Sequence, residues 1–148
     1  MVYTNHMNRS TAAHIINKNQ LLLLLRDNKA TISDPNKWDV PGGSCEVGET
    51  YEQCLIRELV EELELHLTEE RCTYLWESIT LRGNLEHSFL IRITDREKDA
   101  LILHEGQNMR FFTFEKLDAL EFTRHLQNII NLKKEKIEEL LLVPTDYS

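Results

Sequence analysis

Several features are scarce or missing in this sequence of 148 residues, and each absence excludes a class of protein. The longest run of apolar residues, Leu21 to Leu25, is far too short to span a bilayer, and no Lys- or Arg-led apolar segment at the N-terminus suggests a signal peptide. The three cysteines, Cys45, Cys54 and Cys72, form no CxxC pair and cannot all be bridged. They are typical of reduced thiols, so we expect a cytoplasmic protein without a membrane partner.

Basic clusters and several enzyme signatures are missing as well. No positively charged stripe indicates a general nucleic-acid binder. The six histidines are scattered without an HxxxH-like pair, which argues against a zinc site. Pro41-Gly42-Gly43-Ser44 is not followed by Gly-Lys-Ser/Thr, which excludes a P-loop. Ser44, Cys45 and the distant histidines have no spacing typical of a nucleophilic triad.

What the chain does contain predicts one α/β domain over residues 1–148. Hydrophobic residues make up 41% and charged residues 28%, the balance of an ordinary globular protein. The length fits one domain, and no linker divides it. Strands are expected at Ala12–Ile16, Gln20–Leu25, Trp38–Val40, Thr73–Thr80, His87–Ile93 and Met109–Phe114, with a turn at Asn17-Lys18-Asn19 and a last helix over Arg124–Leu141. Periodicity alone leaves a helix open for the five leucines.

The negative charge is concentrated in one segment. The formal net charge is −8, and −6 of it lies between Gly43 and Leu65, which enclose seven acids and a single base, Arg57. A solvated acidic helix face is the ordinary meaning of such a cluster. Thr50 followed by Gln53 resembles a capping box, which predicts that a helix begins there.

Three glutamates of that segment are expected on one face of this helix. Glu58, Glu61 and Glu62 are spaced i, i+3 and i+4. Like charges at this spacing repel each other, and a hard divalent cation is a physical reason to keep them. Mg²⁺ takes oxygen ligands, and it usually keeps waters and substrate phosphate oxygens beside one or two carboxylates. Bound metal would also reverse the local charge, so that a triphosphate could approach.

The same segment resembles the motif of a known family. Counted from Gly43, it reads Gly, five residues, Glu49, seven residues, then Arg57-Glu58-Leu59-Val60-Glu61-Glu62-Leu63-Glu64-Leu65. This resembles the Nudix box, GX5EX7REUXEEXGU with U aliphatic, at every specified position but one across 23 residues. Trp38-Asp39-Val40-Pro41 also resembles the usual approach to the box. The resemblance implies a Nudix hydrolase with an α/β/α sandwich and a mixed β-sheet over most of the chain.

The departure is Glu64, where the family pattern has glycine. That glycine lies near the helix C-terminus, where a left-handed residue can end the helix, and an acid there is mildly unfavourable for the helix dipole. We therefore expect the helix to continue a little further, or to turn differently, towards His66 or Leu67. No metal-binding carboxylate is missing from the box.

The resemblance implies roles for individual residues. Glu58 and Glu62 match the main metal ligands, and Glu61 matches a further ligand or a water-orienting base. The Gly43 carbonyl matches a backbone ligand. Arg57 and Glu49 match a supporting ion pair that positions the catalytic helix; the alternative is a surface salt bridge worth less than about 1 kcal/mol.

One further acid is a candidate outside the box. His104-Glu105-Gly106-Gln107 resembles the loop by which MutT-type members bring another glutamate to the metals. Glu105 is therefore a candidate metal ligand or general base, and the alternative is an ordinary turn glutamate. Which of Glu61, Glu62 and Glu105 acts as the general base stays open.

The resemblance implies a pyrophosphohydrolase that uses Mg²⁺, with Mn²⁺ as the other candidate ion, on a small-molecule nucleotide. The short chain and the HEGQ loop favour MutT-like hydrolysis of nucleoside triphosphates, modified ones included, to a nucleoside monophosphate and pyrophosphate. MutT reads oxidised guanine with an asparagine at the start of its last helix, where this chain has His125, which argues against that specificity. Thr80-Leu81-Arg82-Gly83 lacks the Pro or Tyr that often accompanies an ADP-ribose or diadenosine polyphosphate preference.

Alternatives stay open for the substrate and the class of function. The polar segment Arg26 to Lys37 could shape a pocket for the sugar of a nucleotide sugar. Some Nudix domains bind nucleotides as regulators without hydrolysis, although the intact box carboxylates favour an enzyme. Phe111, Phe112 or Trp76 could stack on a base, but such strand residues more often belong to the core. Many relatives pair as dimers, which leaves a homodimer open.

Overall fold

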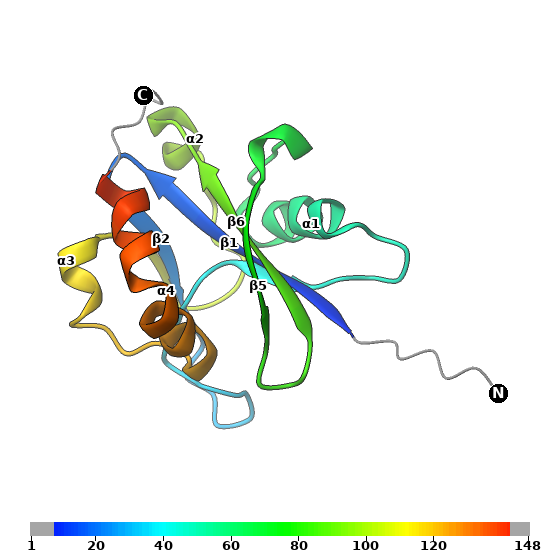
Figure 1. The fold of residues 1–148 in the computed structure, drawn as a ribbon, viewed down its shortest axis with the longest axis horizontal. Coiled ribbons are helices and arrows are strands. Elements are labelled where there is room, and N and C mark those ends of the chain that lie inside the picture. Colours follow the sequence, from blue (N-terminus) through cyan, green and yellow to red (C-terminus); the bar gives the residue numbers. More distant parts are fainter. Residues whose placement is uncertain (1–7, 143–148) are drawn as a thin grey trace.

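The structure, a computed structural model, describes residues 8–142, and its strands form one mixed sheet (Figure 1). The elements are β1 (Arg9–Asn17), β2 (Gln20–Leu25), β3 (Trp38–Asp39), β4 (Gly42–Ser44), α1 (Tyr51–Leu63), a 3-10 turn (Glu69–Arg71), β5 (Thr73–Ile79), β6 (Leu85–Arg92), α2 (Asp95–Asp99), β7 (Asn108–Thr113), α3 (Phe114–Leu117) and α4 (Arg124–Leu142). The sheet order is β3-β2-β1-β6-β5, with β4 paired to β1 and β7 paired to β2. Strands β1 and β6 run parallel, and the other pairs are antiparallel.

The run of five leucines forms a strand that is buried on both faces, as the sequence predicted. Leu22 and Leu24 belong to the hydrophobic cluster on one side of the sheet, and Leu21 and Leu23 belong to the cluster on the other side. The predicted turn before this strand is also confirmed, because Lys18 adopts a left-handed conformation (φ 55°) between β1 and β2. Burial on both faces explains why the strand shows no polar alternation.

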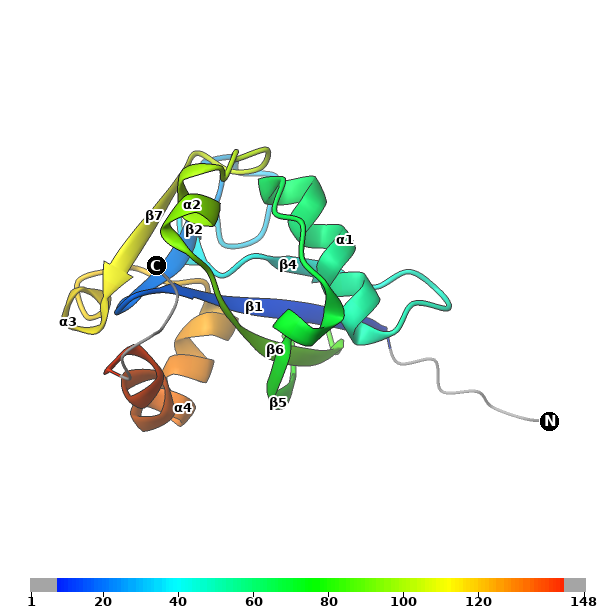
Figure 2. The same cartoon turned by 90° about the horizontal axis from the view of Figure 1, so that it is seen from above.

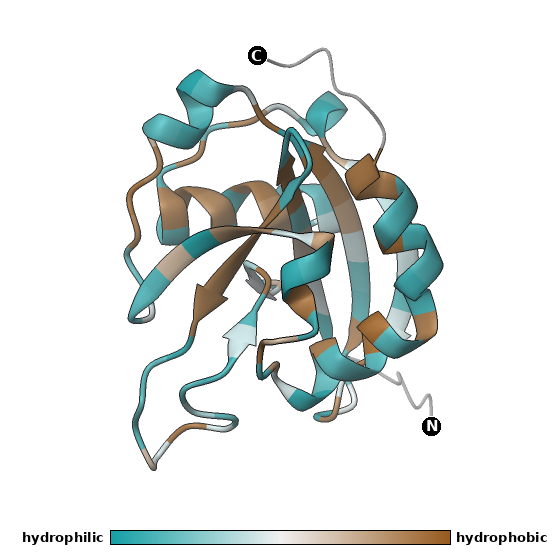
Figure 3. Ribbon diagram, turned by 90° about the vertical axis from the view of Figure 1, so that its left-hand side faces the viewer, coloured by the Kyte–Doolittle hydropathy of each residue, from teal (hydrophilic) through white to brown (hydrophobic). Residues whose placement is uncertain are grey.

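Helices α1 and α4 cover opposite faces of the sheet (Figures 1 and 2), which confirms the predicted α/β/α sandwich. Leu55, Leu59 and Leu63 of α1 pack on one side of the sheet, in the same cluster as Phe89 of β6. The buried residues of α4 pack on the other side: Leu126, Ile129, Ile130, Ile137, Leu140 and Leu141. The hydropathy colouring in Figure 3 accordingly shows mainly hydrophobic central strands and helices banded with both kinds of residue.

The last helix confirms the predicted bounds to within one residue. It runs from Arg124 to Leu142, with a kink at Lys133. Among residues 8–142, no helix is long and apolar enough to cross a membrane. The three cysteines are free thiols.

Several local predictions were wrong. Strand β4 and the short helices α2 and α3 were not predicted, because three to five residues carry too little periodicity to reveal an element. The box helix does not continue beyond Leu63: Glu64 itself adopts the left-handed conformation (φ 52°), and the Leu65 N–H then donates to the Leu59 carbonyl at 3.2 Å. This turn carries Leu65 into the core, where 4% of it is exposed, and its burial explains why the helix ends here despite the acid.

Candidate functional site

The start of α1 is fixed by the predicted capping box. The Thr50 side chain accepts the backbone N–H of Gln53 at 3.0 Å, and the Gln53 side chain accepts the backbone N–H of Thr50 at 3.0 Å. Two of the N–H groups at the helix start are thereby satisfied. The helix therefore begins at a defined place after the loop that follows β4.

Arg57 ties this loop to the helix. Its Nε and one terminal nitrogen donate to the two carboxylate oxygens of Glu49 at 2.8 and 2.9 Å, and it also donates to the Ser44 carbonyl and to Glu58, both at 3.0 Å. These hydrogen bonds lower the pKa of Glu49 to about 2. A two-pronged ion pair is geometrically more specific than a single surface contact. The structure thus brings together the two residues predicted to support the helix.

Glu58 lies directly against the backbone of Gly43. A Cβ atom added to Gly43 would stand 2.5 Å from one carboxylate oxygen of Glu58, so only glycine leaves room for this side chain. The Glu58 side chain is 15% exposed, and burial raises its pKa. The Glu58 carboxylate therefore lies against the glycine of β4 whose carbonyl is the candidate backbone ligand, and both groups offer hard oxygen donors.

Glu62 is the most buried acid of the box, with 5% of the residue exposed. Its carboxylate accepts the Gly42 N–H at 3.2 Å. Burial, together with the negative charges of Glu105 and Glu58, raises the pKa of Glu62 to about 9. The single hydrogen bond from Gly42 does not offset this burial and repulsion, and a bound cation would stabilise the ionised form of Glu62. The donor set of Gly43, Glu58 and Glu62 fits a divalent metal, although the side chains of residues 8–142 form no ready-made group of three such ligands.

The other two candidate acids occupy different surroundings. The Glu61 side chain is 57% exposed, and its carboxylate lies 3.4 Å from Arg57, on the side of the ion-pair network. Glu105 is exposed at a cavity that Glu62 also lines, and it is close enough for its charge to act on Glu62. Glu105 therefore lies near the buried carboxylate of Glu62, whereas Glu61 is directed towards Arg57.

A cavity of about 900 Å³ opens beside these carboxylates. It lies where β1 and β2 separate: the two strands pair only next to their turn, and further along β1 pairs with β4 instead. Gly43, Glu62 and Glu105 line it together with residues from the face of the sheet below α4. This volume is typical of small-molecule sites.

The cavity has a second polar surface that the sequence did not reveal. Asp39, Glu86, Ser88, Thr123 and His125 line it. Glu86 Oε2 lies 2.8 Å from His125 Nε2, and this hydrogen bond raises the pKa of His125, whereas burial raises the pKa of Asp39 to about 6. Of these residues, the sequence singled out only His125, through the resemblance to MutT. Glu86 and Ser88 alternate with Leu85, His87 and Phe89 along β6, but this pattern alone cannot place them under α4.

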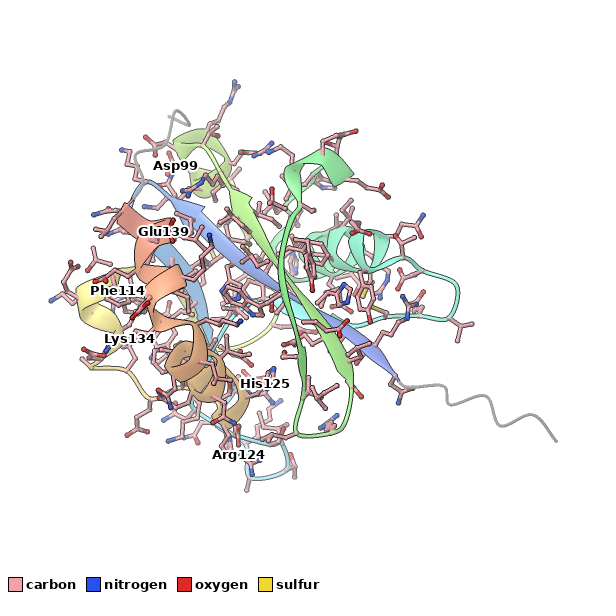
Figure 4. All side chains as sticks on the ribbon, viewed as in Figure 1. Asp99, Phe114, Arg124, His125, Lys134 and Glu139 are labelled. Carbon is pink, nitrogen blue, oxygen red and sulfur yellow. The ribbon has the colours of Figure 1, made fainter. Side chains whose placement is uncertain are left out.

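The polar loop between β2 and β3 borders the cavity, as the sequence suggested for this segment. Arg26, Ile32 and Asp34 line the cavity from the loop. Asp34 accepts hydrogen bonds at 2.9 Å from both the backbone and the side chain of Arg124, which lies beside His125 at the start of α4 (Figure 4). The loop is thus hydrogen-bonded to the last helix by two residues that both line the cavity.

The aromatic residues considered for base stacking belong to the core. Trp76 and Phe112 are 7% and 9% exposed and pack in the cluster below α4, and Phe111 packs against the cluster below α1. The Trp76 ring lies 5.2 Å from the ring of His14, which lines the cavity and is 3% exposed. His14 is therefore a buried residue of the cavity wall.

His14 makes stability depend on pH. Burial lowers its pKa from 6.5 to about 4, so below pH 6.5 the unfolded chain binds a proton that the folded chain does not. Stability from this group is complete above pH 6.5 and is lost as the pH falls towards 4, by on the order of 3 kcal/mol. We expect the melting temperature of the wild type to fall more steeply over this range than that of His14→Gln. The exposed His66→Gln is the control, and parallel wild-type and His14→Gln curves would contradict the prediction.

Comparisons with known proteins agree with this arrangement. Residues 7–132 match the family model described as NUDIX domain. A MutT structure from work on the Aliivibrio salmonicida and Vibrio cholerae proteins superposes with a TM-score of 0.71 at 19% identity, covering 90% of this chain and 98% of that one. The MutT protein from Methanosarcina mazei Go1 gives 0.67 at 18% identity with the same coverage. A bifunctional NMN adenylyltransferase/ADP ribose pyrophosphatase from Francisella tularensis, complexed with AMP and a manganese ion, gives 0.61 at 20% identity, covering 92% of this chain and 43% of that one.

Proposed function

Because the chain belongs to the NUDIX domain family, we propose that it is a Mg²⁺-dependent pyrophosphohydrolase of nucleoside triphosphates or their modified forms. The chain is a hydrolase that acts on phosphoanhydride bonds; the triphosphate and the ion are our proposal, and Mn²⁺ is the alternative ion. One observation carries it: a single cavity holds the buried carboxylate of Glu62 beside a second polar surface, with room for a nucleotide.

The proposed reaction is attack of water on phosphorus. A water oxygen forms the new bond to one of the two phosphorus atoms that flank the bridging oxygen between the monophosphate and the pyrophosphate. The bond from that phosphorus to the bridging oxygen breaks, and nucleoside monophosphate and pyrophosphate separate. A divalent cation, when bound, neutralises phosphate charge and lowers the pKa of the attacking water. Gly43, Glu58 and Glu62 would hold it, and Glu105 would serve either as a further ligand or as the general base.

Side chains of the protein accept the proton and hold the metal-binding helix in position. Glu105 or Glu61 accepts the proton of the water, a step typically worth about 10²- to 10⁴-fold. Arg57 holds Glu49 and Glu58, so the ligand helix keeps its place relative to the Gly43 loop. Pre-set positions of this kind avoid reorganisation during the reaction.

The test is turnover of a nucleotide panel by the purified chain with Mg²⁺, with Mn²⁺ and with EDTA. The panel holds canonical and oxidised nucleoside triphosphates, nucleotide sugars and dinucleoside polyphosphates. We expect a nucleoside monophosphate and pyrophosphate from a triphosphate and no turnover in EDTA, and the product that carries ¹⁸O from labelled water identifies the phosphorus that is attacked. Release of inorganic phosphate without pyrophosphate would reject the proposed cleavage position.

A second candidate is hydrolysis of a nucleotide sugar. The loop from Arg26 to Lys37 favours it, because this loop borders the cavity and is fastened to α4 by Asp34 and Arg124. Turnover of sugar nucleotides in preference to triphosphates would select this candidate. A panel without turnover, in which some nucleotides raise the melting temperature, would instead support a nucleotide-binding regulator.

The second polar surface predicts a base preference. The carboxylates of Asp39 and Glu86 accept hydrogen bonds, so they suit a base edge with an amino group, as in guanine, adenine or cytosine, and oppose the paired carbonyls of uracil and thymine. We expect kcat/KM to be about tenfold or more higher for amino-bearing bases. Glu86→Gln, whose amide can also donate, should reduce this ratio.

The matched control is Glu77→Gln. Glu77 contacts His87 at 2.7 Å, and His87 stacks on Tyr51 of α1, so this acid lies on the other face of the sheet. Its substitution removes one negative charge without touching the cavity surface. Equal rates for uracil and guanine nucleotides in the wild type would contradict the prediction.

A further inference from the structure

Glu64, the residue that departs from the Nudix box, makes a contact that glycine could not make. Its carboxylate lies 2.6 Å from His104 Nε2. The two side chains are about half exposed. Because His104 directly precedes Glu105, this contact joins the end of α1 to the loop that carries the additional candidate ligand.

Glu64 is locally unfavourable for the helix it ends. Its backbone lies in the left-handed region (φ 52°, ψ 32°), which glycine enters without the steric cost that a side chain brings. Its negative charge also stands at the C-terminal end of the helix, where the dipole disfavours anions. Residues in sparsely populated backbone conformations concentrate at functional sites, so the cost of Glu64 at this position points to a compensating role for its contact with His104.

The loop containing Glu105 is anchored on both sides of that residue. On the α1 side, the His104 N–H donates to the Glu62 carbonyl at 2.8 Å. On the β2 side, the Gln107 N–H donates to the Leu25 carbonyl at 2.8 Å, and its side chain donates to the Arg26 carbonyl at 2.8 Å. Glu105 therefore lies between two hydrogen-bonded positions of the loop, His104 and Gln107. The contact of the Glu64 side chain with His104 adds to the first of these attachments, which is the one to α1.

We propose that Glu64 and His104 form a positioning pair, which holds the loop against α1 so that the Glu105 carboxylate stays near Glu62. Glu64 occupies the position of the box glycine, and its side chain adds a contact that attaches the loop to α1. Both residues act through Glu105, so they are positioning residues and not catalytic ones. The inference rests on the proposed function, in which Glu105 serves the metal or the attacking water.

Glu64→Gly tests the pair by separating stability from activity. Glycine suits the left-handed turn, so we expect a higher melting temperature than in the wild type. Loss of the contact between Glu64 and His104 should nevertheless lower kcat about 3- to 10-fold and raise the Mn²⁺ concentration needed for half-maximal rate. The KM for the nucleotide should change less than about twofold. Glu64→Gln, which still accepts a hydrogen bond from His104, should retain more than half of the wild-type kcat.

His104→Ala should reproduce the kcat loss of Glu64→Gly, and the double variant should be no worse than either one, because both remove the same contact. Glu135→Gln, an exposed charge on α4, is the control for net charge. A Glu64→Gly variant with the same kcat and the same half-maximal Mn²⁺ concentration as the wild type would contradict the proposed positioning pair. A wild type that hydrolyses no nucleotide would reject the proposed function instead; direct Mn²⁺ binding then tests the pair, and equal affinities in wild type and Glu64→Gly would overturn it.

Discussion

Replacing Glu62 with glutamine should lower hydrolysis at least about a thousandfold and leave the protein folded, a loss that corresponds to about 4 kcal/mol of transition-state stabilisation. Glu62 is 5% exposed and lies close to the negative charges of Glu58 and Glu105. The glutamine amide has the same shape, and its oxygen can still accept the Gly42 N–H. The variant therefore loses the anionic ligand without losing the packing.

Melting curves with and without metal provide the check on Glu62→Gln. Without metal, the melting temperature of the variant should equal that of the wild type or exceed it, because the neutral amide needs neither the proton nor the nearby cation that the buried carboxyl needs. Mg²⁺ or Mn²⁺ should raise the melting temperature of the wild type much more than that of the variant. A Glu62→Gln variant that keeps more than a tenth of the wild-type kcat would remove Glu62 from the proposed ligand set.

The same assay can assign the general base. Glu61→Gln and Glu105→Gln are compared with the wild type for kcat and for the metal-induced rise in melting temperature. The general base is the residue whose replacement lowers kcat by about 10²-fold or more while that rise is preserved. If Glu105→Gln lowers both kcat and the metal-induced rise in melting temperature, Glu105 is a metal ligand.

Gly42→Ala should destabilise the whole protein by about 2–4 kcal/mol and lower the melting temperature accordingly. Gly42 pairs with Ala12 of β1 and has a φ of 149°. An added Cβ would collide with the Thr11 carbonyl oxygen and stand 2.9 Å from Ala12 Cα, and these backbone atoms of a central strand cannot move aside. The same displacement would shift the N–H that Glu62 accepts.

Gly48→Ala separates the collision from backbone strain. Gly48 also has a positive φ (88°), but an added Cβ would meet no atom within 4 Å. We expect it to lose only about 1 kcal/mol, from the left-handed backbone alone. Equal melting temperatures for the two variants, measured by calorimetry, would show that the contact between β4 and β1 does not limit stability.

Prediction from sequence succeeded where local chemistry decides the structure. The capping box at Thr50 and the leucines of β2 were predictable, because a helix start needs nearby hydrogen-bond partners and a doubly buried strand needs only apolar residues. The end of α1 was predicted wrongly for an equally physical reason. Burial of Leu65 outweighed the local preference for glycine at Glu64, and burial depends on the whole fold.

The amino-acid sequence by itself determined the family, the sandwich architecture and the set of acids on the box helix, since helical spacing alone places Glu58 and Glu62 on one face. Only the tertiary structure decided what surrounds them. The separation of β1 from β2 opened the cavity, the parallel pairing of β1 with β6 placed Glu86 on its polar surface, and the loop after α2 brought Glu105 to Glu62. These are contacts between residues far apart in the chain, and no local pattern encodes them, because they depend on how separate strands and loops pack together.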